Sequence, residues 1–222
     1  MKERYFTSDT IQEKSREMLN KLKQYRHKHD INFTPEHSAL IILDMQRYFL
    51  HQGSHAFIPS ALSIVPKIKD LLHTFLKLDL PIILTRHLNK AEDAKLMRIW
   101  WNDLITEESV MSEIIPEMNF PGTTIVKKTQ YDAFYQTPLE NLLRENGVTQ
   151  VVITGVMTHL CCETTARSAF VKGFTVFFPI DGTATYNEDF HRATLLNLSH
   201  GFAIPVLIEE LQDALQRYRC EH

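Results

Sequence analysis

Six short apolar runs recur along the chain, separated by segments that mostly show helical periodicity. The clearest run, 39–43, contains only alanine, leucine and isoleucine and leads directly into Asp44. A strand that is apolar on both faces is typical of the interior of a parallel sheet. The pattern predicts strands at 39–43, 81–85, 124–126, 151–154, 175–180 and 204–208.

Helical patterns occupy most of the intervals between these runs. Over 61–78, apolar residues recur three and four positions apart, which indicates one buried helical face. Gly147 and Gly173 are typical stop signals for two further helices. The expected helices are 8–28, 61–78, 138–146, 160–172, 188–200 and one after 208. This alternation predicts an α/β fold, a three-layer α/β/α sandwich with a six-stranded, mainly parallel sheet.

Two segments stand outside this alternation. The stretch 90–122 is irregular, and we expect an insertion over one end of the sheet. The first helix has few apolar positions among many charges, so residues 1–35 are predicted to form an N-terminal helical arm on a main domain, 36–222. The arm either crosses a neighbouring subunit or folds back on its own domain.

Composition limits the classes of function. The chain has 222 residues, 44% of them hydrophobic, which suits one large core. A net charge of −3 gives no basic face for nucleic acid. No run reaches the roughly 18 apolar residues of a membrane helix, and the N-terminus lacks a signal-peptide pattern. Of three cysteines two are adjacent, which is no disulfide framework. We therefore expect a cytoplasmic protein that acts on small molecules.

Three reactive side chains follow predicted strands. Asp44 follows the first strand, Lys128 the third and Cys161 the fourth. In a parallel sheet, residues after strand carboxyl ends gather at one edge, where ligands bind. The first turn of a helix and a nearby lysine would favour a Cys161 thiolate, and Asp44 could take the thiol proton. The sequence thus predicts a site for covalent catalysis.

Three motifs resemble the isochorismatase-like hydrolase superfamily. They are 43–49 (LDMQRYF), 128–134 (KTQYDAF) and 155–166 (GVMTHLCCETTA), and the resemblance covers roughly residues 36–210. It implies that Asp44 is the catalytic aspartate. It also implies that Lys128, rather than Lys127, is the catalytic lysine and Cys161, rather than Cys162, the nucleophile.

The resemblance also implies a reaction. It places a cis peptide at Val156–Met157 and an oxyanion hole formed by the backbone N–H groups of Met157 and Cys161. Cys161 would attack a small amide or ureido substrate and form a thioester, with Asp44 moving protons and Lys128 stabilising charge. This cycle needs no cofactor and no metal. Members of the superfamily commonly form dimers or tetramers, so a homo-oligomer is expected.

Other readings remain open. Isochorismatases cleave a vinyl ether with the aspartate as acid, but they typically carry glycine in the place of Cys161. Nicotinamidases add a metal through an Asp-x-His segment after the second strand, where this chain has His87 and Asn89. His51, His55 and His87 would have to converge to replace it. A catalytically silent binding or assembly protein is a further class, against which the intact triad argues.

Residues near the motifs are candidates for the pocket wall. Arg86 could hold a substrate carboxylate, and a tryptophan could cover the site. Asp132 departs from the serine usual at its position, so the pocket beside Lys128 is expected to differ from familiar ones. The predicted substrate-binding residues are Gln46, Phe49, Arg86, Trp100, Tyr131 and Phe134.

Overall fold

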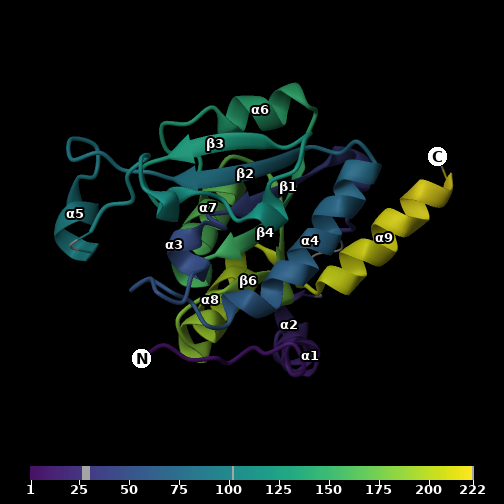
Figure 1. Ribbon diagram of the computed structural model, residues 1–222. Coiled ribbons are helices and arrows are strands. Elements are labelled where there is room, and N and C mark those ends of the chain that lie inside the picture. The colour runs from purple at the N-terminus through teal and green to yellow at the C-terminus, as the bar shows by residue number, and fades with distance from the viewer. Residues whose placement is uncertain (27–30, 102, 222) are drawn as a thin grey trace.

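A parallel sheet forms the centre of the molecule in the computed structural model, which describes residues 1–26, 31–101 and 103–221 (Figure 1). Its strand order is β3-β2-β1-β4-β5-β7, with β6 pairing at the end of β4, and every pairing is parallel. The strands are β1 Ser38–Leu43, β2 Ile82–His87, β3 Thr124–Lys128, β4 Gln150–Val156, β5 Thr175–Pro179, β6 Thr183–Ala184 and β7 Ile204–Val206.

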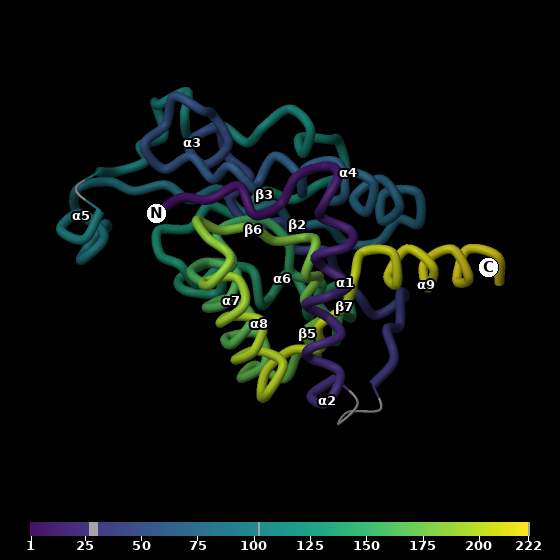
Figure 2. Tube along the Cα trace, turned by 90° about the horizontal axis from the view of Figure 1, so that it is seen from below, coloured from purple at the N-terminus to yellow at the C-terminus, as the bar shows by residue number. Residues whose placement is uncertain are grey.

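Helices cover both faces of this sheet, so the predicted three-layer fold is confirmed. Helices α4 and α9 pack together on one face, whereas α7 and α8 lie together on the other (Figure 2). None of the helices in the described part is both long and apolar enough to cross a membrane. The helices are α1 Ile11–Lys21, α2 Lys23–Arg26, α3 Arg47–Leu50, α4 Ala61–Lys77, α5 Leu96–Trp101, α6 Leu139–Glu145, α7 Glu163–Val171, α8 Glu188–Gly201 and α9 Ile208–Glu221.

The strands fall where the apolar runs predicted them, with one addition. All six residues of β1 are buried, as expected for a strand covered on both faces. The addition is β6, whose two residues pair with Gly155 and Val156 of β4. Two residues are too few to show a period, so this strand could not be predicted from the pattern of apolar residues.

The N-terminal arm folds back on its own domain. The expected helix 8–28 is split into α1 and α2, and residues 27 and 28 lie outside the described ranges. Ile11 and Met18 of α1 are buried, and Arg16 forms an ion pair with Glu209 of α9 at 3.0 Å. The second of the two expected placements is therefore the one observed.

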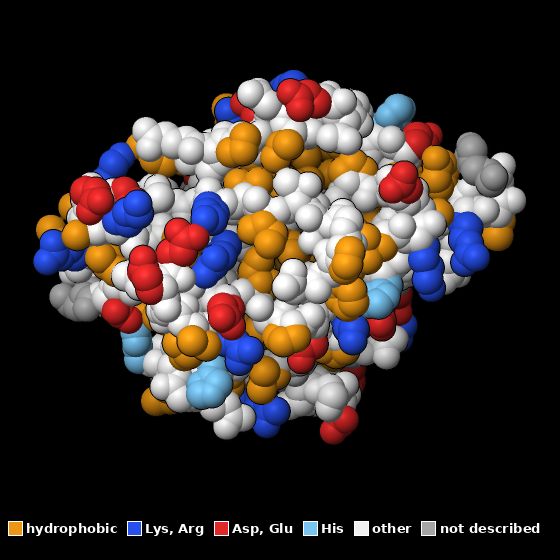
Figure 3. Space-filling model, turned by 45° about the horizontal axis from the view of Figure 1, so that its top comes forward, with side chains coloured by type: hydrophobic (Ala, Val, Ile, Leu, Met, Phe, Trp, Pro, Cys, Tyr) orange, Lys and Arg blue, Asp and Glu red, His pale blue; other side chains and the backbone are white. Residues whose placement is uncertain are grey.

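The insertion between β2 and β3 projects beyond the sheet. It carries α5 and two single-turn helices, and α5 extends away from the body of the molecule (Figure 1). Leu96, Ile99 and Trp100 are about three-quarters exposed. On the face shown in Figure 3, acidic and basic side chains are interspersed among hydrophobic ones.

Strand order changes direction between β1 and β4. The chain proceeds from β1 to β2 and β3 on one side, and from β4 to β5 and β7 on the other. Side chains that follow β1 and β4 therefore meet at this switch point. The two strands also approach closely there, because a Cβ on Gly155 would lie 2.1 Å from the carbonyl oxygen of Leu43. With φ at +105°, only glycine fits Gly155 without strain.

We expect Gly155→Ala to lower the free energy of unfolding by about 3 kcal/mol or more, because strain and a backbone clash act together. Urea unfolding followed by circular dichroism measures the change. Gly147→Ala is the matched control, since Gly147 also has a positive φ but has no heavy atom within 4 Å of an added Cβ. Its loss should be about 1 kcal/mol. Equal losses in the two variants would contradict the close approach of β1 and β4.

Candidate active site

Asp44 is the first residue after β1 and is fully buried. Its φ of 52° lies in the left-handed region, which aspartate tolerates better than most residues. Thr85 on the neighbouring strand β2 holds it from two directions. The Thr85 hydroxyl donates to Asp44 Oδ1 at 2.6 Å and accepts from the Asp44 backbone N–H at 3.1 Å. The carboxylate therefore has a fixed orientation.

Lys128 ends β3 and reaches across β2 to the same carboxylate. Its Nζ lies 2.8 Å from Asp44 Oδ2, and both side chains are fully buried. Burial opposes both charges, but the attraction between them prevails. The pKa of Asp44 is therefore lowered and the pKa of Lys128 raised. The two groups form an ion pair at neutral pH.

Cys161 completes the cluster from the opposite side of the switch point. It lies in a π-helical turn, Thr158–Cys162, that connects β4 with α7. Its Sγ is 3.3 Å from Lys128 Nζ, whereas the Sγ of Cys162 faces the Thr154 carbonyl at 4.0 Å. The geometry thus places Cys161, and not Cys162, beside the Lys128 ammonium. The expected cis peptide is present at Val156–Met157.

The protonation of Cys161 differs from our expectation of a thiolate. Burial raises the pKa of Cys161 to about 12; Lys128 lowers it, and the Asp44 carboxylate raises it further. The lysine charge is already neutralised by Asp44, which leaves little to stabilise a second anion. In the absence of substrate, Cys161 is therefore a neutral thiol beside an ionised Asp44.

His87 contacts the ion pair and is held by Asn89. The Asn89 amide donates to the Thr129 carbonyl, so its Oδ1 faces His87 Nε2 at 2.8 Å. His87 Nδ1 lies 3.2 Å from Lys128 Nζ. Burial and the Lys128 charge lower the pKa of His87 to about 4. The ring is therefore neutral, and its Nδ1 can accept a hydrogen bond from Lys128.

The three histidines proposed as possible metal ligands do not converge. His87 lies inside the cluster, whereas His55 lies at the pocket mouth and His51 accepts a hydrogen bond from the Gly53 N–H. Across 1–26, 31–101 and 103–221, no three His, Cys, Asp or Glu side chains come together as metal ligands.

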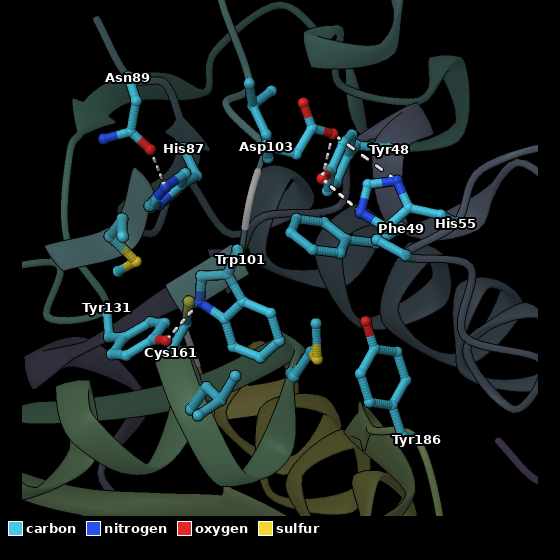
Figure 4. Close-up of a pocket in the computed structure, with 15 residues that line it drawn as sticks. Tyr48, Phe49, His55, His87, Asn89, Trp101, Asp103, Tyr131, Cys161 and Tyr186 are labelled. Atoms are coloured by element: carbon cyan, nitrogen blue, oxygen red, sulfur yellow. Dashed lines mark hydrogen bonds and ion pairs between the residues drawn. The ribbon is translucent and has the colours of Figure 1, made fainter. Parts of the chain in front are cut away.

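A small apolar pocket opens onto Cys161 (Figure 4). Its cavity volume is about 160 Å³, well below the roughly 300–1,000 Å³ of pockets for drug-sized ligands. None of its described lining residues is a lysine or an arginine. It is lined by Tyr48, Phe49, His55, Ala56, His87, Asn89, Met97, Trp101, Asp103, Ile105, Tyr131, Met157, Leu160, Cys161 and Tyr186.

Two polar residues expected in the pocket wall lie elsewhere. The Gln46 amide is buried and fully used, because it donates to the carbonyls of His87 and Ser112 and accepts from the His87 N–H. The Arg86 guanidinium donates to the Ser112 carbonyl at 2.9 Å and to the Glu107 carbonyl at 3.3 Å. Both residues anchor the 107–112 loop. Neither lines the pocket.

Aromatic candidates divide in the same way. Phe49 and Tyr131 line the pocket as expected. Phe134 stacks on Phe174 in the core instead. Trp100 is 75% exposed, and its neighbour Trp101 lines the pocket in its place, donating to the Tyr131 hydroxyl at 2.7 Å. The short helix α5 sets which tryptophan faces inward, and that helical phase could not be read from the sequence.

The pocket mouth contains a polar group that the sequence did not indicate. The Tyr48 hydroxyl donates to Asp103 at 2.9 Å and lies 3.0 Å from His55 Nε2. Figure 4 shows these three side chains together across the cavity from Cys161. They come from α3, from the loop after it and from the insertion, so only the folded chain brings them together.

Several known proteins are similar to this chain in sequence or in fold. The isochorismatase domain model matches residues 38–210. Nicotinamidase 3 of Arabidopsis thaliana is 40% identical over 183 residues, covering 80% of this chain and 88% of the relative. Enterobactin synthase component B of Escherichia coli is 30% identical over 196 residues, covering 85% and 67%. A cysteine hydrolase structure from Pseudomonas syringae superposes with a TM-score of 0.81 at 23% identity, covering 83% of this chain and 95% of that one.

We expect iodoacetamide to label Cys161 at least about tenfold more slowly than the exposed Cys220 at pH 7.5, because the buried thiol is protonated. Peptide mass spectrometry after timed quenching measures both rates. Raising the pH toward 10 should speed the labelling of Cys161. Faster labelling of Cys161 than of Cys220 at pH 7.5 would show that a thiolate is present without substrate.

Proposed function

The chain belongs to the isochorismatase family of hydrolases, and we propose that it hydrolyses the C–N bond of a small, neutral carboxamide. One observation carries this proposal. The Sγ of Cys161 lies 3.3 Å from Lys128, whose Nζ is 2.8 Å from Asp44, at the inner end of an apolar pocket. A nucleophile, a base and a fixed cation at these distances suit acyl transfer.

The proposed reaction begins when the amide enters the pocket. The Cys161 thiol transfers its proton to Asp44, and the sulfur attacks the carbonyl carbon. The backbone N–H groups of Met157 and Cys161 are the proposed donors to the oxyanion. Asp44 then returns the proton to the departing ammonia, which leaves a thioester on Cys161. Water attacks the thioester while Asp44 accepts a proton from it, and Asp44 then passes this proton to the departing Cys161 sulfur, which releases the acid and restores the thiol.

Lys128 stabilises charge throughout this cycle. Its ammonium keeps Asp44 ionised before attack and offsets the negative charge that develops on sulfur. The Gln130 carbonyl accepts from Nζ at 2.9 Å, and the neutral His87 ring lies beside it. Neither of these partners adds a competing charge. The ammonium therefore stays directed toward Asp44 and Cys161.

The lining of the pocket favours a neutral substrate. A carboxylate bound there would lose its hydration, and the described lining offers no lysine or arginine to compensate. The one acid of the lining, Asp103, would repel it. Isochorismate carries two carboxylates and ureido acids carry one, so both fit this pocket poorly. The name of the relative Nicotinamidase 3 points to the same class, a flat neutral carboxamide.

Vinyl-ether hydrolysis with Asp44 as the acid remains the alternative, since it needs no thiol. The ion pair with Lys128 keeps Asp44 ionised, so Asp44 holds no proton to give in that step. The location and assembly of the protein stay predictions. We expect a cytoplasmic protein, because a reducing compartment suits three free cysteines. We expect a homo-oligomer because members of the superfamily commonly form dimers or tetramers.

We expect Cys161→Ala to lower ammonia release from nicotinamide by roughly 10³-fold or more, because no thioester can form. A coupled ammonia assay measures kcat. Cys162→Ala is the matched control: its sulfur faces the Thr154 carbonyl and lies outside the pocket lining, so kcat should change by less than about threefold. Ammonia release that survives Cys161→Ala would exclude the covalent route.

We also expect nicotinamide to be preferred over amides that carry a carboxylate. The kcat/KM for nicotinamide should exceed that for a ureido acid by about 100-fold or more, because the anion would be buried without a counter-ion. The rates of ammonia release from nicotinamide and from the ureido acid are measured in parallel with the rate of pyruvate release from isochorismate. Pyruvate release that exceeds ammonia release would favour the vinyl-ether reaction, and no release from any of them would favour a silent binding protein.

A further inference from the structure

The first residues of the chain contact the backbone of residues that line the pocket, although the proposed reaction does not use them. Residues 2–7, here called the N-terminal strap, pass between the loop after α3 and the start of α8 (Figure 2). The Glu3 N–H donates to the Tyr186 carbonyl at 2.7 Å, and the Lys2 ammonium donates to the His55 carbonyl. Since Tyr186 and His55 line the pocket, the strap supports two parts of its wall.

Tyr5 is the most firmly held polar residue of the strap. It is 5% exposed, and its hydroxyl accepts from the Thr185 N–H at 3.0 Å. The same hydroxyl lies 3.2 Å from Nδ1 of the buried His191 on α8. Burial raises the pKa of Tyr5 and lowers the pKa of His191 to about 3. The hydroxyl therefore keeps its proton, and the ring is neutral.

His191 connects Tyr5 with the turn that carries the nucleophile. Its Nδ1 lies 3.1 Å from the hydroxyl of Thr158, which is also fully buried. Thr158 follows Met157 and opens the turn Thr158–Cys162. The hydroxyls of Tyr5 and Thr158 therefore meet at the same nitrogen of His191, which can accept from one of them or, as an N–H, be shared by both. This shared contact joins the strap, through α8, to the turn that holds Cys161.

We propose that Tyr5 is a positioning residue, which acts through His191 and Thr158 to hold the turn carrying Cys161. The sulfur and the two proposed oxyanion N–H groups belong to Cys161 of this turn and to Met157, the residue directly before it. An error of about 1 Å in such an arrangement is enough to lower turnover by up to about 100-fold. The proposal uses the proposed amide hydrolysis for one of its two tests.

The test compares Tyr5→Phe, Thr158→Val and the double variant in full-length protein. Tyr5→Phe keeps the ring and removes only the hydroxyl. With nicotinamide, we expect kcat to fall by about tenfold with KM within about twofold of wild type. We also expect iodoacetamide labelling of Cys161 at pH 9 to quicken by about threefold, because a looser turn exposes the thiol. The double variant should lose no more than the worse single variant.

Ser38→Ala is the matched control. Ser38 is a buried residue whose hydroxyl donates to the Pro35 carbonyl at 2.8 Å, at the start of β1 and so at the opposite edge of the sheet. It should lower stability without changing kcat or the labelling of Cys161. Unchanged kcat and labelling in folded Tyr5→Phe would overturn the proposal, as would losses that multiply in the double variant.

Two further measurements keep the outcomes distinct. If wild type releases no ammonia from nicotinamide, the proposed function fails, and the labelling rates alone decide the role of Tyr5. If Tyr5→Phe does not fold, Thr158→Ser and Thr158→Val decide. The proposal is supported if Cys161 is labelled at the wild-type rate in Thr158→Ser but faster in Thr158→Val. Equal labelling rates in the two variants overturn it.

Discussion

The buried ion pair between Lys128 and Asp44 is the constraint on which the rest of the site depends. Two charges without solvent are tolerated only where their geometry is good and their remaining polar atoms are satisfied. Thr85 satisfies the aspartate, and the Gln130 carbonyl and the His87 ring satisfy the lysine. Removing one partner of such a pair costs about 3–5 kcal/mol because the other charge is then buried without compensation, so the fold tolerates each of the two charges only with its partner.

The sheet topology explains why this pair forms where it does. Lys128 lies two strands away from β1, and its side chain spans the end of β2 to reach Asp44. Cys161 follows β4, on the other side of the switch point. The ion pair therefore lies between the half of the sheet that begins at β1 and the half that begins at β4. The pocket is apolar because of side chains from the insertion and from neighbouring segments. Under the proposed function, this lining, more than the triad, would separate neutral from charged substrates.

How well each feature could be predicted depends on how far apart along the chain the interacting residues lie. Buried strands can be predicted from local apolar runs. The ends of these strands predict that Asp44, Lys128 and Cys161 lie at one edge of the sheet. The pocket wall depends instead on contacts between distant segments. The sequence allows Arg86 to bind a carboxylate, but in the fold its guanidinium donates to the Ser112 and Glu107 carbonyls. Which of Trp100 and Trp101 faces the pocket depends on the phase of a six-residue helix. The Cys161 thiolate failed as an expectation because burial cannot be read from a motif.

The protonated state of Cys161 bears on how long the enzyme survives chemically. Peroxides and electrophilic metabolites attack thiolates far faster than thiols, and oxidation beyond the sulfenic acid is generally irreversible. In the proposed reaction the sulfur becomes an anion only when a carbonyl carbon is beside it, so it would be exposed to such damage only during turnover. Keeping the thiol neutral at rest would therefore let one deeply buried atom serve as the proposed nucleophile without being a standing target for oxidants.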